Sequence, residues 1–221
     1  MTALADPERQ LALSHAPAAL REPLSLLWQL DERLGAIVAA AREPAIGAMR
    51  LLWWRDALIR LDDPAAIVPA EPLLAAIAEQ LLPAGLSGAA LAELEEGWAA
   101  LLDDAEPRED AILHHGAWRG GRLFVLSAKL LGAESDDIVT GGEGWALADL
   151  SHRLSFAEGR AFARRTAREK LAAIMPGRWP GPLGMLILLA KRDAAMPAAK
   201  QRRQGSPARL ARSLVYYIFG R

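Results

Sequence analysis

Proline repeatedly follows an acidic residue or a serine in this chain, and four of these pairs precede a segment that the sequence marks as a helix. These four pairs are Asp6-Pro7, Glu43-Pro44, Glu71-Pro72 and Ser206-Pro207. Proline is favoured in the first turn of a helix, where its missing N–H is not needed, and disfavoured further in. We therefore expect helices that begin at these pairs. The first predicted helix begins at Pro7. Together with other capping residues, the sequence predicts nine further helices, at about 23–41, 44–62, 71–83, 87–105, 108–131, 136–154, 155–175, 183–195 and 207–219.

Composition points to the same fold class. The 221 residues include 45 Ala and 37 Leu, but only 18 Val, Ile and Thr together. Ala and Leu favour helices and β-branched residues favour sheets. We expect an all-α fold of about nine or ten helices, in a single domain that spans residues 1–221. The absence of cysteine excludes a disulfide scaffold, Cys-ligated zinc and a thiol nucleophile.

Charge is distributed unevenly along the chain. Residues 160–221 contain 14 Arg and Lys but only Glu169 and Asp193 as acids, a formal +12, whereas residues 1–159 carry a formal −13. The two halves could pack against each other. Alternatively, the basic C-terminal third could contact an anionic partner, such as a membrane surface at its periphery or a diphosphate. The net charge of −1 gives no support to nucleic-acid binding.

Targeting signals are not recognised at the start of the sequence. The first ten residues carry Asp6 and Glu8 and no basic n-region. The longest apolar run, 183–190, is too short to cross a bilayer. We expect a cytoplasmic protein, with the inner membrane as a site of peripheral contact. Residues 196–208 contain two Pro, one Gly and a basic cluster, and we expect a mobile loop there.

One pair of carboxylates differs from the others. Most acidic doublets fall near expected helix ends, but Asp31-Glu32 lies inside an apolar helical segment. Its neighbours are Leu26, Leu27, Leu30, Leu34 and Ile37. A buried acid needs a partner or a polar cavity, so this pair is either paired internally or solvated on the outer face. The adjacent His114 and His115 point about 100° apart on a helix, and we expect structural or surface roles for them rather than a shared metal ion.

The segment 50–58, RLLWWRDAL, is the most distinctive in the sequence. Two adjacent tryptophans cannot face one direction on a helix. We expect at least one of Trp53 and Trp54 to be largely buried in the core, with Arg50, Arg55 and Asp56 beside them.

Two runs resemble the squalene/phytoene synthase family and its short bacterial members. Residues 21–32 read REPLSLLWQLDE and residues 42–58 read REPAIGAMRLLWWRDAL, close to the family's EP-x-x-G-x-x-R-x-x-WW-R-D-A-L signature. Three later segments agree more weakly, at 144–150, 158–162 and 209–221. The resemblance implies an all-α isoprenoid-synthase fold, a prenyltransferase-like activity in isoprenoid biosynthesis, and Mg²⁺ held by two aspartate-rich motifs. It also marks Arg50, Trp53, Trp54, Arg55 and Asp56 as signature or cavity residues.

Both acidic motifs are incomplete. The first should read Asp-Asp-x-x-Asp, but Asp31 and Glu32 are followed by Gly35 at the third position. Of the second, Arg153 and Glu158 are the candidate remnants. No metal site and no catalytic residue is therefore assigned, and Mg²⁺ is expected only in a catalytic protein.

Two functions stay open at this point. The first is a synthase-like protein that binds or transfers a prenyl diphosphate. The second is a non-catalytic relative, similar to the family's respiratory complex I assembly factor, which binds a protein partner or an isoprenoid or other lipid-like ligand.

Overall fold

The computed structural model describes residues 3–102, 106–175, 179–196 and 202–219, and every regular element in these ranges is helical. The all-α prediction is confirmed for this part of the chain. The first elements are α1 (Pro7–Leu13), the short 3₁₀ turn η1 (Ala18–Leu20), α2 (Arg21–Ala40), α3 (Pro44–Arg60) and α4 (Pro72–Gln80). They are followed by α5 (Gly88–Ala92), α6 (Leu94–Ala99), α7 (Glu109–His115), the π-helical segment η2 (Gly116–Gly121) and α8 (Arg122–Leu130). The last are α9 (Ile138–Leu150), α10 (Ala157–Ala172), α11 (Gly181–Ala195) and α12 (Pro207–Phe219).

Helix starts follow the prolines. The Asp6 carboxylate accepts the backbone N–H groups of Glu8 and Arg9 at the start of α1. Helices α3 and α4 carry proline in the first turn, as predicted. The first N–H groups of a helix have no carbonyl partner within the helix. A capping carboxylate accepts hydrogen bonds from them, and a proline in the first turn removes one of these donors.

Two predicted helices differ from those observed. The described part of the segment 87–105 forms two short helices, α5 and α6, rather than one. The helix predicted over 155–175 begins later than expected, because α10 starts at Ala157 and is preceded by Phe156 without a side-chain cap. Instead the Arg160 guanidinium donates to the carbonyls of Leu154 and Ser155.

The helix predicted over 108–131 is present, with a wider turn in its middle. Helices α7 and α8 are joined by η2, and the three segments run on without a loop. A π-helical turn inserts an extra residue per turn and redirects the side chains within it. Here that segment includes Arg119, a residue that is 1 % exposed.

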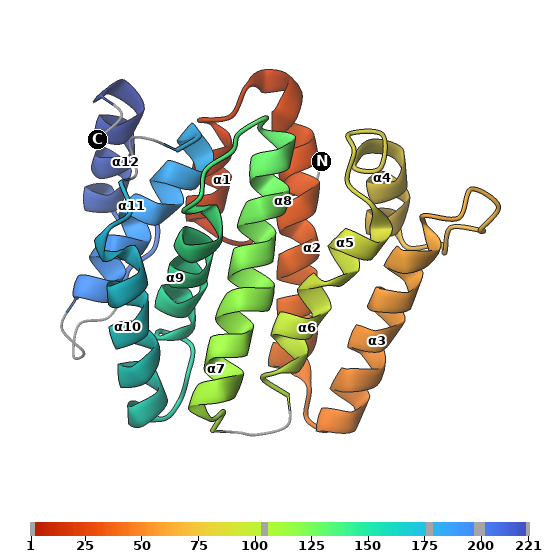
Figure 1. Cartoon of the computed structure of the whole chain (residues 1–221), viewed down its shortest axis with the longest axis horizontal. Coiled ribbons are helices and arrows are strands. Elements are labelled where there is room, and N and C mark those ends of the chain that lie inside the picture. The colour runs from red at the N-terminus through yellow and green to blue at the C-terminus, as the bar shows by residue number, and fades with distance from the viewer. Residues whose placement is uncertain (1–2, 103–105, 176–178, 197–201, 220–221) are drawn as a thin grey trace.

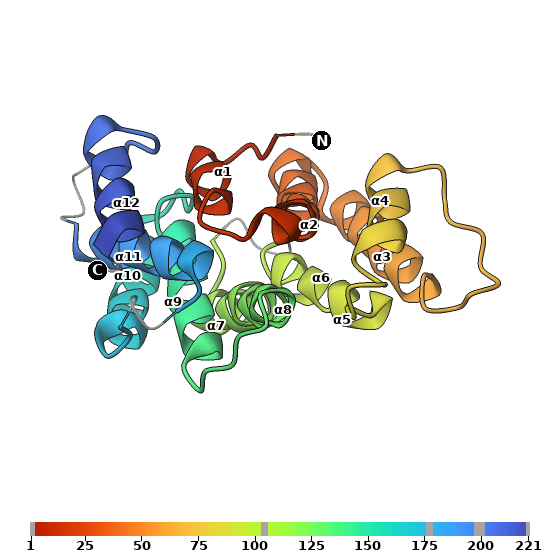
Figure 2. The ribbon, with the colours of Figure 1, turned by 90° about the horizontal axis from the view of Figure 1, so that it is seen from above.

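The helices form layers around a central pair. Figure 1 shows α2 and the continuous α7–η2–α8 running side by side, with α3 and α4 at one end of the molecule and α10, α11 and α12 at the other. Figure 2 shows α1 and α2 on one side of α7 and α8. One hydrophobic cluster extends from α1 to α12.

Glycines allow the closest of these contacts. A Cβ on Gly120 of η2 would lie 2.2 Å from the Gly142 carbonyl oxygen of α9, and one on Gly142 would lie 2.3 Å from that of Gly120. Both positions therefore require glycine. Gly141 and Gly144 of α9 also allow close packing, because a Cβ on Gly141 would meet the Trp179 ring and one on Gly144 would meet the Leu171 side chain.

Two sequence expectations concern the polar and apolar segments near the end of the chain. Of the loop predicted over 196–208, residues 197–201 lie outside the described residues. In the described remainder, Arg202 reaches Asp149, and the Gln204 amide donates to Asp6. None of the described helices combines the length and the hydropathy needed to cross a membrane.

Candidate functional site: a buried chain of ion pairs

Eight charged side chains alternate in sign through the interior, and we call them the ion-pair chain. In order of contact they are Arg9, Asp31, Arg119, Asp149, Arg202, Asp193, Arg209 and Glu8. Seven of the eight are buried, and Arg202 is 12 % exposed. Four carboxylates face four guanidinium groups, so the chain is neutral as a whole. Because Glu8 and Arg9 are adjacent in sequence, the first and last members of the ion-pair chain both lie in α1.

Asp31 of α2 lies at the most enclosed point and is 0 % exposed. Its Oδ1 accepts from the Trp98 Nε1 (2.8 Å) and the Arg119 Nε (3.0 Å). Its Oδ2 accepts from Arg9 and from the second arm of the Arg119 guanidinium. Burial alone would raise the pKa of Asp31, but the charges and hydrogen bonds of Arg119 and Arg9 hold that pKa well below its usual value. Asp31 is therefore ionised, and its acceptor sites are occupied by protein donors.

Gly35 explains how Trp98 reaches Asp31. A Cβ at position 35 would lie 2.7 Å from Cη2 of the Trp98 indole, closer than real contacts allow. The ring thus fills the space beside position 35, one helical turn after Asp31. Where the family's first motif places a third carboxylate, this chain has glycine and an aromatic ring.

Arg119 lies in the middle of the ion-pair chain and contacts two of its acids. Its guanidinium carbon lies 4.3 Å from the Trp98 ring centroid and 4.8 Å from that of Trp145, so the cation is held between two aromatic faces. The Nη1 atom donates to Asp149 at 3.0 Å, while Nε donates to Asp31. One arginine therefore joins an acid on α2 to an acid on α9.

His115 lies one helical turn before Arg119 and is 0 % exposed. Its Nδ1 donates to the Gly97 carbonyl at 2.7 Å, and its Nε2 lies 3.4 Å from an Arg119 nitrogen. Burial and the neighbouring Arg119 charge lower the pKa of His115 to about 3. The imidazole is neutral and has a structural contact at Nδ1, in keeping with the role expected from the sequence.

Asp149 of α9 accepts hydrogen bonds from three arginines. Its Oδ2 accepts from Arg119 and from the Arg153 Nε, both at 3.0 Å, and its Oδ1 accepts from Arg202 at 3.1 Å. Burial would raise its pKa, but these charges set the pKa of Asp149 well below the ordinary value. Of the two candidates for the second motif, Arg153 is thus joined to the chain, whereas Glu158 is exposed at the start of α10.

The last links tie α12 to α1 and α11. Arg209 donates to Glu8 (2.7 Å from Nη2 to Oε2) and to Asp193 (3.0 Å from Nη2 to Oδ2). A cavity of about 20 Å³ lies beside these groups and beside Asp149 and Arg202. This volume is enough for about one water molecule.

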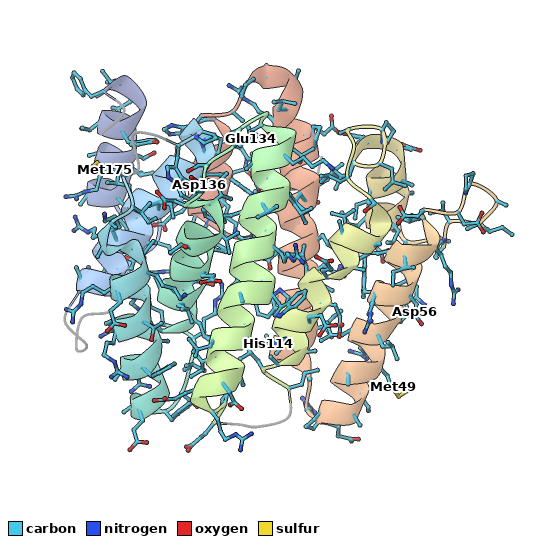
Figure 3. The ribbon with its side chains drawn as sticks, viewed as in Figure 1. Met49, Asp56, His114, Glu134, Asp136 and Met175 are labelled. Carbon is cyan, nitrogen blue, oxygen red and sulfur yellow. The ribbon has the colours of Figure 1, made fainter. Side chains whose placement is uncertain are left out.

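The other predicted site residues do not belong to the ion-pair chain. Glu32 accepts the backbone N–H groups of Ala5 and Asp6 and so fastens the segment before α1. On α3, Trp54 is 5 % exposed and Trp53 is 47 % exposed, which confirms that at least one tryptophan is buried. Arg50, Arg55 and Asp56 are exposed on the same helix. Figure 3 shows Asp56 and Met49 on α3, away from the central helices.

Most of the ion-pair chain was missed by reasoning from the sequence. Arg119 sits in a glycine-rich stretch with no spacing relation to Asp31, and Asp149 was noted only as part of a resemblance. A signal was present, since an acid at position 149 interrupts an apolar helix just as Asp31 does. A buried acid of this kind requires a cation from elsewhere in the chain.

The residues present do not fit a Mg²⁺ ion. Mg²⁺ in proteins is bound by carboxylate oxygens with water or substrate phosphate. Asp31 and Asp149 are instead saturated by guanidinium and indole donors, and a dication would have to displace them. In the described part of the chain, no group of three or more His, Asp or Glu side chains is arranged to bind a metal ion.

Comparison of the sequence and the structure with known proteins assigns no family to this protein. No protein-family model, no curated protein and no solved structure matches the chain. The resemblance to squalene/phytoene synthases therefore stays a prediction from the sequence motifs.

Proposed function

We propose that this protein is a non-catalytic relative of the squalene/phytoene synthases, with the isoprenoid-synthase type of fold, which acts by binding a protein partner in an assembly role. The observation that carries the proposal is the position of Asp31 within the ion-pair chain. The acid that would begin a metal-binding motif is held by Arg9, Arg119 and Trp98. Asp149 of α9 is likewise held by Arg119 and Arg202.

The space around the ion-pair chain supports the same proposal. Transfer between prenyl diphosphates needs room for a long apolar chain and for a diphosphate. The cavity beside Asp149 holds about 20 Å³. Two larger hollows lie at the surface, between α2 and α4 and beside the α8–α9 loop. Glu32 lines the first of them, but neither is lined by Asp31 or Asp149.

Helix α3 is the favoured surface for a protein partner. It exposes five large apolar side chains, and apolar patches on a surface commonly mark interaction sites. They are Ile46, Met49, Leu52, Trp53 and Ile59. This helix also carries the run that resembles the family's signature. A partner-binding surface on α3 gives the exposed Trp53, Arg50 and Arg55 a role that needs no substrate.

The substitution Asp31→Asn separates a structural acid from a metal ligand. As a member of the ion-pair chain, Asp31 neutralises buried arginines, so its loss should lower the free energy of unfolding by about 3–5 kcal/mol. A metal ligand in a metal-free protein behaves differently, because removing one of several crowded carboxylates leaves stability unchanged or raises it. Denaturant unfolding without Mg²⁺ measures the difference. Asp56→Asn, an exposed acid on α3, is the matched control and should change stability by less than about 0.5 kcal/mol.

A turnover assay completes the test. Purified protein is incubated with Mg²⁺ and farnesyl or geranylgeranyl diphosphate, and released diphosphate is measured. We expect release at the level of the blank. Mg²⁺-dependent turnover that is abolished by Asp31→Ala would overturn the proposal and make the protein a prenyltransferase.

A further inference from the structure

Helix α12 is built with its polar side inward. Its buried positions include Arg209 and Ser213, which are 5 % and 1 % exposed, and one aromatic residue, Tyr216, which is 4 % exposed. Arg209 is bound by Glu8 and Asp193, and the Ser213 hydroxyl lies within hydrogen-bond distance of the His15 Nε2. A surface helix in water ordinarily does the reverse and turns its apolar stripe to the core.

The outward side of α12 is apolar. Five large hydrophobic side chains on this helix are 46–63 % exposed. They are Leu210, Leu214, Val215, Ile218 and Phe219. Leu210, Leu214 and Ile218 are spaced four residues apart and form one stripe, and Val215 and Phe219 form a second beside it. The helix cannot turn this side inward without pulling Arg209 from its two carboxylates.

Charge identifies what covers this surface. Arg203 and Arg212, just before and on α12, are exposed. Within residues 160–221 the two acids are Glu169 and Asp193, and Asp193 is already bound to Arg209 and Arg202. Figures 1 and 2 place α10, α11 and α12 together at one end of the molecule, so this end carries a strong positive excess. A helix with an apolar face and flanking arginines has the character of an interfacial helix on an anionic bilayer.

We infer that α12 docks the protein onto an anionic membrane surface, with Leu210, Leu214 and Ile218 in the acyl-chain boundary and Arg203 and Arg212 at the headgroups. The 13 residues of α12 give a helix about 20 Å long that lies in the plane of the interface. This inference does not depend on the proposed function, because it concerns neither the ion-pair chain nor α3.

Vesicle flotation with the full chain tests the inference. Vesicles of phosphatidylcholine alone are compared with vesicles containing 30 % phosphatidylglycerol. We expect at least tenfold more bound protein on the anionic vesicles. The double substitution Leu214→Glu with Ile218→Glu should reduce binding at least tenfold, and Arg203→Gln with Arg212→Gln should reduce it several-fold. Met49→Glu, an apolar position on α3 that is more exposed than Leu214 or Ile218 and lies at the other end of the molecule, should leave binding unchanged.

Three results would overturn the inference. They are the absence of wild-type binding to anionic vesicles, equal loss of binding in Met49→Glu, and a wild-type oligomer that Leu214→Glu with Ile218→Glu converts to monomer without a change in vesicle binding. The last result would assign the apolar side of α12 to a second copy of the chain. Circular dichroism of each variant confirms that the helices are intact, as the exposure of the substituted side chains leads us to expect.

Discussion

A hydrogen atom in place of a side chain at position 35 decides what Asp31 can bind. The Trp98 ring occupies the volume that a Cβ at this position would enter, and its indole N–H reaches Asp31. Sequence reasoning registered Gly35 as a missing carboxylate. It had no means of predicting the ring, because Trp98 lies 63 residues further along the chain and its approach depends on the packing of α6 against α2.

Restoring an acid at this position should damage the fold rather than build a site. Gly35→Asp places Cβ within 2.7 Å of Trp98 and adds a carboxylate near Asp31. We expect a loss of about 1–3 kcal/mol or more from overpacking, and no gain in Mg²⁺ affinity. Urea unfolding and a Mg²⁺ titration by calorimetry measure the two effects. Ala36→Asp, an exposed neighbour on α2, controls for the added charge.

The adjacent tryptophans of α3 should differ sharply in their energetic contribution. Trp54 is 5 % exposed and Trp53 is 47 % exposed. Trp54→Ala should cost about 3–5 kcal/mol, the usual range for a large buried aromatic. Trp53→Ala should cost less than about 1 kcal/mol. Chemical denaturation of both variants checks this, and equal losses would contradict the assignment of Trp53 to the surface.

At the scale of elements, the sequence predicted helix positions better than helix junctions. Prolines after Asp6, Glu43 and Glu71 marked starts that the structure has, because their effect on the backbone is local. The π-helical turn within 108–131 was not predicted. It places Arg119 between the Trp98 and Trp145 rings, a tertiary arrangement with no local signature.

The attachment of α12 should depend on a single arginine. Arg209→Met leaves Glu8 and Asp193 buried opposite an uncharged side chain. Breaking a buried pair in this way costs about 3–5 kcal/mol. We expect lower stability together with faster amide hydrogen exchange throughout 207–219. Arg209→Lys keeps the charge but not the two-armed geometry, and should give an intermediate loss. Unchanged exchange in Arg209→Met would show that α12 is held by its apolar contacts alone.

At the scale of the whole molecule, the uneven charge of the sequence has a partial explanation. The basic C-terminal third supplies Arg202 and Arg209 to acids from the first 159 residues, so the two halves do pack on each other. That alternative was stated from the sequence, but the particular partners were not. Glu8 and Arg209 are separated by 201 residues, and no spacing rule connects them.

Acid should destabilise the protein in two stages. The pKa of His115 is about 3 in the folded protein against 6.5 for the free side chain, so the unfolded chain takes up a proton that the folded chain does not. Stability therefore falls as pH drops from about 6.5. His15 and His152, whose pKa values burial also lowers, act in the same direction. Below about pH 4 a second fall begins, because Asp31 and Asp149 have lowered pKa values and must stay ionised to hold the arginines.

Thermal unfolding between pH 3 and pH 8 measures both stages. His115→Gln should flatten the slope between about pH 4 and pH 6.5, and leave the steeper fall below pH 4 in place. A flat profile for the wild-type protein down to pH 4 would contradict the neutral, buried state of His115.

The contact between Glu8 and Arg209 also sets a schedule for biosynthesis. A ribosome releases α1 first, but Glu8 meets its arginine only after residue 209 has emerged. At about 5–20 residues per second, the nascent chain spends on the order of ten seconds or more before Glu8 can pair with Arg209. The ion pair between α1 and α12 therefore forms later than the contacts of Arg9 with Asp31 and of the segment before α1 with Glu32 of α2, and contacts so distant in sequence form slowly.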